Sequence, residues 1–208
     1  MGDISPVVFV VDDDASVREA LESLLRSAGF QARTFCSAQE FLDAAPLDAL
    51  ACLVLDMWLP GTNGLDLQRE LAARRAHLPI VFISGNGDIR MSVRAIKAGA
   101  IEFLPKPFHD QDLLDAVQQA LQGAEIAQKE REETREVAAR FATLTPRERQ
   151  VLELVVRGRL NKQIAAELGI REVTVKIHRA QVMHKTRAGS LPELVRLSQR
   201  VGIGLAQA

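Results

Sequence analysis

The first 122 residues of this 208-residue chain alternate five times between a short apolar run and an amphipathic stretch. The apolar runs are Val7–Val11, Ala32–Cys36, Leu53–Leu55, Ile80–Ile83 and Ile101–Leu104. Strands that are apolar at nearly every position are expected when both faces of a sheet are covered. The alternation therefore predicts an α/β domain with a five-stranded parallel sheet, whose functional site lies at the carboxyl ends of the strands.

The charge changes sign along the chain, although the net charge is only -1. Residues 1–122 carry 10 Lys or Arg and 17 Asp or Glu, residues 123–143 carry 4 and 5, and residues 144–208 carry 12 and 5. An acidic part joined to a basic part indicates two domains with different partners, and the basic part favours a polyanion. We therefore divide the chain into a domain at 1–122, a charged linker at 123–143 and a second domain at 144–208.

The linker, residues 123–143, contains no Pro and a single Gly. Its acidic side chains stand near basic ones at a spacing that permits i,i+4 pairs in a helix. We interpret this segment as a solvated helical linker that continues the preceding helix. A flexible charged tether fits the same residues, and the sequence leaves both interpretations open.

The basic part, residues 144–208, has no strand pattern and predicts a small all-α domain. Thr145, followed by Pro146 and by Glu148 at the third helical position, is typical of a capped helix start. Four short helical segments separated by tight, Gly-containing turns follow from there. This arrangement predicts a helix-turn-helix domain.

Polar side chains follow the predicted strands at the points where the strands end: Asp12, Asp13 and Asp14 after the first, Asp56 after the third, Ser84 after the fourth and Lys106 after the fifth. Because the carboxyl ends of parallel strands meet at one edge of a sheet, we expect these side chains to share one crevice. Clustered carboxylates repel one another unless a cation neutralises them, and oxygen ligands suit Mg²⁺. The sequence therefore predicts a Mg²⁺ site, with Asp14 more simply explained as the cap of the helix that follows.

Four stretches of the acidic part together resemble the receiver domain of two-component response regulators: Val11–Asp14, Leu55–Pro60, Ser84-Gly85 and Lys106–Phe108. The similarity extends over residues 5–122 in order and spacing. It implies a flavodoxin-like sheet with strand order 2-1-3-4-5. The residues from Pro60 to Gly64 form a turn, in which we expect Gly64 to need a positive φ.

The resemblance implies that Asp56 accepts a phosphoryl group from a sensor histidine kinase. Asp13 and Asp56 would bind Mg²⁺ directly, together with the backbone carbonyl of Trp58, and Asp12 would act mainly through a bound water. Trp58 and Asn86 would also stand beside the path of an attacking water, where they could influence the lifetime of the phosphate.

The resemblance also implies roles for residues near the last two strands. Lys106 would pair with the phosphoryl oxygens, Ser84 would donate a hydrogen bond to another oxygen, and the Lys106–Pro107 bond would be cis. Phe103 takes the place of the switch aromatic, whose movement would reshape the surface that pairs two receivers. Core packing is a serious alternative explanation of Phe103, and both roles can hold at once.

Three stretches of the basic part resemble the LuxR/NarL-type helix-turn-helix: Leu144–Glu153, Asn161–Ile170 and Val173–Arg179. The stretch Ser190–Arg196 adds a similarity to the FixJ-like branch, which joins this domain to a receiver. By this resemblance the helix Glu172–Arg187 is the recognition helix and double-stranded DNA is the partner. The last helix, near 191–201, would pair two DNA-binding domains, although core packing uses the same apolar pattern.

Helical spacing divides the recognition helix into two faces, with Val175 and Val182 toward the core. Lys176, Ile177 and Ala180 lie on the opposite stripe, which suits the major groove because apolar groups meet thymine methyls and Lys meets guanine acceptors. A single exposed Ile is common on protein surfaces, so Ile177 alone decides nothing. Candidate phosphate contacts, which would position the duplex without specifying sequence, are Lys162, Thr174, Arg179 and Lys185.

Together these features predict a transcription regulator, most simply an activator, rather than an enzyme. Phosphorylation of Asp56 would favour a homodimer, which raises the effective concentration of two DNA-binding units on promoter DNA with two half-sites. RNA polymerase is the further partner expected there. Two alternatives remain: a receiver whose output binds RNA or protein, and a Mg²⁺-dependent aspartyl-phosphate phosphatase, although such enzymes need a second acid where Trp58 stands.

Composition restricts the compartment in which the protein works. The chain has 2 Cys, which argues against a disulfide framework or a zinc site and for a reducing compartment. The apolar runs are too short to span a bilayer, and residues 1–6 show no basic stretch before an apolar one. We therefore expect a cytoplasmic protein with no membrane partner and no export signal.

Overall fold

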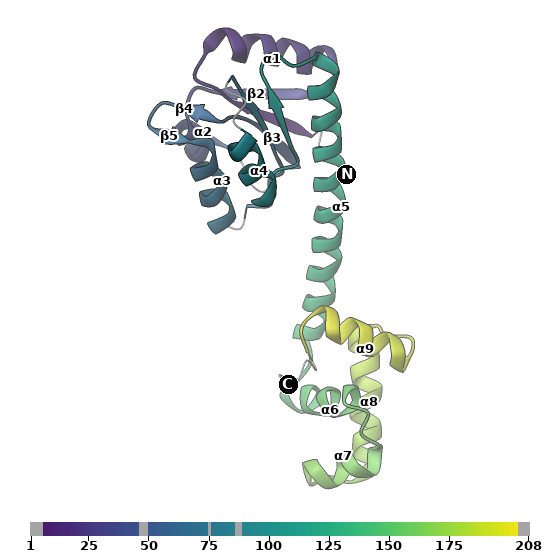
Figure 1. The fold of residues 1–208 in the computed structure, drawn as a ribbon. Helices are drawn as coiled ribbons and strands as arrows, with labels where there is room; N and C mark the ends of the chain where they lie inside the picture. The colour runs from purple at the N-terminus through teal and green to yellow at the C-terminus, as the bar shows by residue number, and fades with distance from the viewer. Residues whose placement is uncertain (1–5, 46–49, 75, 86–88, 204–208) are drawn as a thin grey trace. The chain divides into compact units, whose positions relative to one another are not determined.

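The structure, a computed structural model, describes residues 6–203 apart from 46–49, 75 and 86–88 (Figure 1). Contacts within the chain divide it into two compact units, Met1–Gln128 and Lys129–Ala208. This division lies inside the predicted linker. Each unit is described by itself.

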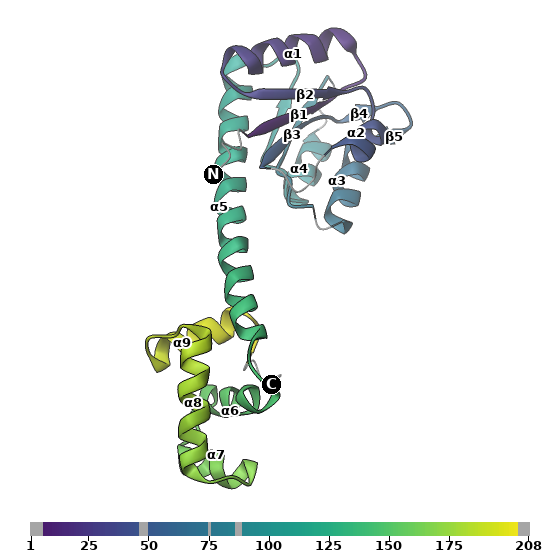
Figure 2. The same ribbon diagram turned by 180° about the vertical axis from the view of Figure 1, so that it is seen from behind.

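The first unit is a parallel five-stranded sheet with helices on both faces (Figures 1 and 2). The strand order β2-β1-β3-β6-β7 confirms the predicted flavodoxin-like order, because β4 and β5 form a separate two-stranded hairpin. The strands are β1 (Val7–Val11), β2 (Gln31–Phe35), β3 (Ala51–Asp56), β4 (Trp58–Leu59), β5 (Thr62–Asn63), β6 (Ile80–Ser84) and β7 (Glu102–Pro105). The helices are α1 (Ala15–Ser27), α2 (Ala38–Ala44), α3 (Gly64–Ala73), α4 (Ile89–Lys97) and α5 (Asp110–Ala142).

Two apolar clusters cover the two faces of this sheet. On one face, Phe9 of β1 packs with Phe35 and Phe41, at ring-centroid distances of 6.0 and 5.6 Å, and α2, α3 and α4 add further side chains. On the other face, α1 and α5 pack against the remaining side chains of the central strands. The central strands β3 and β6 are buried at every position, as expected for strands covered on both faces. The edge strand β2 instead alternates exposed and partly buried residues before its buried last residue, Phe35.

The hairpin of β4 and β5 directly follows β3, the strand that ends at Asp56, and the sequence did not predict it. Within it Gly61 has the positive φ, 78°, that only Gly adopts without strain. The expectation that Gly64 needs a positive φ is wrong. A Cβ on Gly64 would lie 2.8 Å from the backbone oxygen of Asp56 and 2.9 Å from the Phe82 ring, so close packing requires Gly there.

Helix α5 begins at Asp110 and continues without interruption to Ala142, so the segment 123–143 is helical through Ala142. Four helices follow: α6 (Pro146–Val156), α7 (Asn161–Leu168), α8 (Glu172–Thr186) and α9 (Leu191–Arg200). Thr145 and Glu148 form the expected capping box at the start of α6. Gly169 ends α7 with φ 64°, which makes the tight turn into α8.

The second unit has one apolar core, to which α6, α7, α8 and α9 all contribute. Val137 and Phe141, from the last two turns of α5, belong to the same core and are 5% and 2% exposed. The core of this unit therefore includes residues before the predicted boundary at 144. Within the part of the chain that the structure describes, no helix combines the length and the apolar character that crossing a membrane requires.

Candidate functional site

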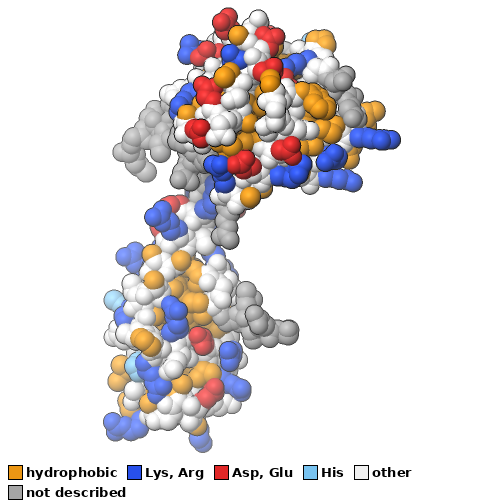
Figure 3. All heavy atoms as spheres, turned by 90° about the vertical axis from the view of Figure 1, so that its left-hand side faces the viewer, with side chains coloured by type: hydrophobic (Ala, Val, Ile, Leu, Met, Phe, Trp, Pro, Cys, Tyr) orange, Lys and Arg blue, Asp and Glu red, His pale blue; other side chains and the backbone are white. Residues whose placement is uncertain are grey.

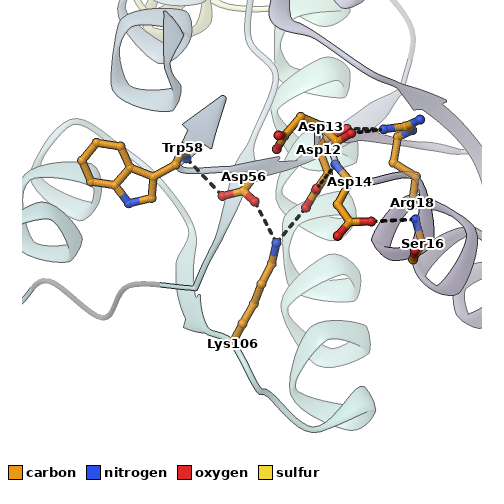
Figure 4. A network of polar contacts seen from close by, with 8 residues as sticks. All are labelled: Asp12, Asp13, Asp14, Ser16, Arg18, Asp56, Trp58 and Lys106. Atoms are coloured by element: carbon orange, nitrogen blue, oxygen red, sulfur yellow. Dashed lines mark hydrogen bonds and ion pairs between the residues drawn. The ribbon is translucent and has the colours of Figure 1, made fainter. Parts of the chain in front are cut away.

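Three carboxylates gather at the carboxyl edge of the sheet (Figure 4). Asp12 follows β1 and Asp56 ends β3, and oxygens of Asp12, Asp13 and Asp56 lie within 4.8 Å of one another. Asp12 and Asp56 are buried, at 0% and 7% exposure, whereas Asp13 is exposed. Three converging carboxylates with one side open to solvent fit a hard divalent cation such as Mg²⁺, which keeps several waters when bound.

Lys106 joins two of these carboxylates (Figure 4). Its Nζ donates to Asp12 Oδ2 and to Asp56 Oδ2, both at 2.7 Å. The residue follows β7, and its backbone N–H donates to the carbonyl of Ser84 at 2.7 Å. The Lys106–Pro107 bond is cis, as expected. The sheet therefore brings Asp12, Asp56, Ser84 and Lys106 to one place, as the strand ends predicted.

Burial and hydrogen bonding shift the pKa values of Asp12 and Lys106 in opposite directions. Burial raises the pKa of Asp12 above its ordinary value, although the hydrogen bond from Lys106 opposes that rise. Burial would lower the pKa of Lys106, but its hydrogen bonds to Asp12 and Asp56 outweigh burial and raise it. Lys106 thus carries a positive charge beside the two buried carboxylates, where a point charge stabilises added negative charge.

Both oxygens of Asp12 accept hydrogen bonds within the protein. Oδ1 accepts the backbone N–H of Asp14 at 2.9 Å, and Oδ2 accepts Lys106. This arrangement fits the expectation that Asp12 acts on a metal through water. Asp14, in contrast, caps α1 by accepting the N–H of Ser16 at 2.8 Å, as predicted, and this bond lowers its pKa.

Asp56 and Trp58 are linked through the backbone. The N–H of Trp58 donates to Asp56 Oδ1 at 3.1 Å (Figure 4), and Trp58 is 49% exposed. Two oxygens of Asp56 thus face two fixed donors, Trp58 and Lys106. The metal-binding role of the Trp58 carbonyl stays a prediction, and Asn86 lies outside the described residues.

Ser84 lies on β6, the strand next to β3, and Phe103 lies on β7, the strand next to β6. Ser84 is completely buried at the end of β6, on the same sheet edge as Asp56. Phe103 of β7 is partly buried, and its ring lies 6.5 Å from that of Phe82 in the core. The core contact expected for Phe103 is therefore present, and its role as a switch stays a prediction.

Arg18 is a residue near the site that the sequence did not single out. From α1 its Nη1 donates to the carbonyls of Asp12 at 2.8 Å and Asp13 at 2.9 Å. A signal was available, because Arg18 stands four residues after the helix cap Asp14 and so faces back toward it. The Arg18 guanidinium thus contacts the backbone of the loop that carries Asp12 and Asp13, two of the three carboxylates.

The second unit presents the predicted recognition helix, α8, with two different faces. Val175 and Val182 are buried in the core, as expected. Ile177 is 57% exposed, and Lys176 and Ala180 are exposed beside it. On the face of the molecule drawn in Figure 3, Lys and Arg side chains are more prominent on this unit than acidic ones. This surface combines exposed apolar groups with positive charge, which suits a DNA groove.

The four candidate phosphate contacts differ in their surroundings. Lys162 is exposed and Thr174 is partly buried, but Arg179 donates to Asn161 Oδ1 at 2.9 Å. Lys185 Nζ lies 2.7 Å from Glu148 Oε2, so it joins the end of α8 to the capping box of α6. Lys185 therefore has a structural partner that a phosphate contact would have to displace, and Arg179 has one as well.

Two families match this chain. The response regulator receiver domain matches residues 8–118, and the bacterial regulatory proteins of the luxR family match residues 142–198. The chain belongs to the response regulators. As such it combines a receiver with a LuxR-type DNA-binding domain, for which a histidine kinase and DNA are the partners that the two families imply.

Several relatives resemble this response regulator over nearly its whole length. Nodulation protein W of Bradyrhizobium diazoefficiens is 53% identical over 200 residues, which cover 95% of this chain and 87% of that protein. FixJ of the same organism is 44% identical over 196 residues, which cover 94% of this chain and 96% of FixJ. The solved structure of the response regulator StyR is 54% identical, with a TM-score of 0.83 over 94% of this chain and 99% of that one. The similarity to FixJ-like regulators is thereby confirmed.

Proposed function

We propose that this response regulator is switched by Mg²⁺-dependent phosphorylation of Asp56 by a sensor histidine kinase, and that the phosphorylated form pairs and activates transcription from specific promoters. The observation that carries this proposal is the convergence at one sheet edge of three carboxylates, with oxygens within 4.8 Å of one another, and of Lys106, which bonds Asp12 and Asp56 at 2.7 Å. Receiver domains typically bind Mg²⁺, and Asp12, Asp13 and Asp56 are the residues that would hold it.

The chemistry is the transfer of one phosphoryl group to a carboxylate oxygen of Asp56. The bond from phosphorus to the histidine nitrogen of the kinase breaks as the bond to the Asp56 oxygen forms, so the imidazole leaves and no proton is needed from Asp56. Bound Mg²⁺ supplies positive charge for the phosphoryl oxygens. Lys106 stabilises the same oxygens, and Ser84 donates to one of them once the phosphate is present.

The surface that would pair two receivers lies on α4 and β7. Ile89, Val93 and Ile96 of α4 are 78%, 45% and 44% exposed, an apolar group that is unusual on a solvated helix. Beside them a hollow of about 380 Å³ is lined in part by Phe103 and Pro105. Since Phe103 borders this hollow, a movement of its ring toward a phosphorylated Asp56 would change the surface that a second copy meets.

Pairing would place two copies of α8 on two half-sites of one promoter. The Lys176, Ile177 and Ala180 surface would read base edges, with Lys162 and Thr174 contacting phosphates. Activation would follow from a contact with RNA polymerase at that promoter. We propose that all of this takes place in the cytoplasm, where the kinase and the DNA can both be reached.

The test is phosphorylation of the full chain by acetyl phosphate in the presence of Mg²⁺. Wild type should take up one phosphoryl group, and Asp56→Asn should take up none. Asp66→Asn, which removes an exposed carboxylate on α3, is the matched control and should label like wild type. Label retained on Asp56→Asn would refute the assignment of the phosphoacceptor.

We also propose that the protein is a regulator and not a phosphatase that turns over substrates. An aspartyl-phosphate phosphatase needs a second acid two residues after the nucleophile, where this chain has Trp58. Turnover of phosphorylated metabolites would contradict this view. Competition between duplex DNA and RNA in gel shifts would test the nature of the output, with preference for RNA rejecting the DNA assignment.

A further inference from the structure

We infer that Arg18 is a positioning residue that holds the Asp12–Asp13 backbone in the geometry that divalent cation binding needs. One nitrogen of its guanidinium donates to two successive carbonyls, at 2.8 Å to Asp12 and 2.9 Å to Asp13 (Figure 4). These are the two residues that bring two of the three clustered carboxylates. The inference rests on the proposed function, because it assumes that this cluster holds the metal.

The local backbone explains why such a contact matters. The β1 ladder ends at Val11 and α1 begins at Ala15, so Asp12 and Asp13 lie between two regular elements. Arg18 contacts the backbone carbonyl of Asp12, whereas the carboxylate of Asp12 is held by the N–H of Asp14 and by Lys106. Asp13 is exposed, and Arg18 fixes its carbonyl from α1. Arg18 therefore connects the position of Asp13 to a rigid helix.

Arg18 has two effects on the affinity for a divalent cation, and they have opposite signs. Its hydrogen bonds go to neutral carbonyls, so they do not neutralise its positive charge. As a positive charge, the guanidinium would repel a divalent cation, but Arg18 is only partly buried and its charge is screened by salt. As a fixed donor pair, it orders the ligands, and removing an outer-shell partner of this kind typically weakens metal binding by about 10- to 100-fold. We therefore expect positioning to outweigh repulsion, so that loss of Arg18 weakens binding.

The experiment measures binding of Mn²⁺ to the full chain from the electron paramagnetic resonance signal of the free ion, with Mn²⁺ standing in for Mg²⁺ at an oxygen site. Arg18→Met should bind Mn²⁺ about 10-fold more weakly than wild type. Arg18→Lys keeps the charge and a donor nitrogen but lacks the planar guanidinium, and it should recover part of the loss. Arg26→Met is the matched control on α1, since Arg26 pairs with Glu22 there, and it should bind like wild type.

A second measurement separates positioning from general damage. The rate of acetyl phosphate labelling is followed against Mg²⁺ concentration: in Arg18→Met the half-saturating concentration should rise about 10-fold, while the rate at saturating Mg²⁺ should stay near that of wild type. A merely structural role would lower the maximal rate as well. If Arg18→Met fails to fold, Arg18→Lys gives the same comparison with the smaller shift.

The outcomes distinguish this inference from the proposal on which it rests. If wild type binds Mn²⁺ and Asp13→Asn loses binding, the metal site stands. Unchanged binding by Arg18→Met in that setting overturns the inference about Arg18 alone, as does tighter binding, which would mean that charge repulsion dominates. If Asp13→Asn binds as wild type does, the proposed metal site itself fails.

Discussion

Gly64 occupies a position at which β3, the strand that carries Asp56, and the core leave no room for a side chain. Its N–H donates to the carbonyl of Met57 at 2.9 Å, which holds the start of α3 against the end of β3. A Cβ there would meet the Asp56 backbone at 2.8 Å and the Phe82 ring at 2.9 Å. The backbone oxygen cannot yield as the end of a flexible side chain can, so the strand that carries Asp56 would have to move.

We therefore predict that Gly64→Ala destabilises the first unit by about 1–3 kcal/mol and slows acetyl phosphate labelling of Asp56. Chemical unfolding and the labelling rate measure the two effects. Gly123→Ala is the control with the opposite sign: its Cβ would enter open space on α5, and it should stabilise by about 0.5–1 kcal/mol. Equal stability of Gly64→Ala and wild type would contradict the close-packing argument.

Glu148 serves two elements of the second unit at once. Its carboxylate accepts the N–H of Thr145 at 2.8 Å, which completes the capping box, and it accepts Lys185 at 2.7 Å. The hydrogen bond from Lys185 holds the pKa of Glu148 below its ordinary value of 4.5. Since the folded pKa is depressed, the stabilisation is present above the unfolded pKa and is lost as pH falls through the folded one.

The consequence is a pH-dependent difference between wild type and Glu148→Gln. At pH 7 the variant should be less stable by about 1 kcal/mol, because it loses the charged partner of Lys185. Below pH 4.5 the difference should shrink as wild-type Glu148 becomes protonated. Thermal unfolding across pH 3–7 measures this, and a difference that does not change with pH would reject the role given to the carboxylate charge.

At the scale of elements, sequence patterns predicted the features that are determined by residues close together in the chain. Apolar runs, helix caps such as Asp14 and Thr145, and polar residues at strand ends were enough to predict the parallel sheet and the acidic crevice, whereas the strand order came from the resemblance to receiver domains. The hairpin of β4 and β5 was missed because two-residue strands have too few positions to show a period. The partner of Lys185 was missed because Glu148 lies 37 residues away and only tertiary packing brings them together.

This distinction leads to different expectations for two lysines of α8. Lys176 is exposed and its Nζ lies 3.8 Å from Glu172 on the same helix, so Lys176→Ala should leave stability nearly unchanged and weaken specific DNA binding. The expected loss is about 1–3 kcal/mol of discrimination, measured as the ratio of specific to nonspecific affinity at fixed salt. An unchanged footprint would reject α8 as the recognition helix.

Lys185→Ala is the comparison within the same helix. Because Lys185 joins α8 to Glu148, its removal should lower the unfolding midpoint of the second unit. Its effect on DNA should follow only from that loss of stability. A drop in affinity with unchanged stability would instead support the original prediction of a phosphate contact.

At the scale of the whole molecule, the compact second unit begins before the matched DNA-binding domain. The family match of the DNA-binding part begins at residue 142, whereas the compact second unit begins at Lys129. The last third of α5 supplies Val137 and Phe141 to the core of that unit. It also meets α9, because Arg200 donates to the Thr134 hydroxyl at 2.9 Å and to the Glu130 carbonyl at 3.1 Å.

These contacts predict that a fragment of residues 129–208 folds cooperatively, whereas a fragment of 144–208 is less stable by several kcal/mol. The reason is apolar burial: truncating one buried Phe typically costs about 3–5 kcal/mol, and the shorter fragment lacks Phe141 together with Val137. Urea unfolding of both fragments measures the difference. Within the longer fragment, Phe141→Ala should reproduce most of it and the exposed Arg131→Ala should not, because only the first removes a core contact. Equal stability of the two fragments would place the start of the DNA-binding unit at 144, and α5 would then be only a connector.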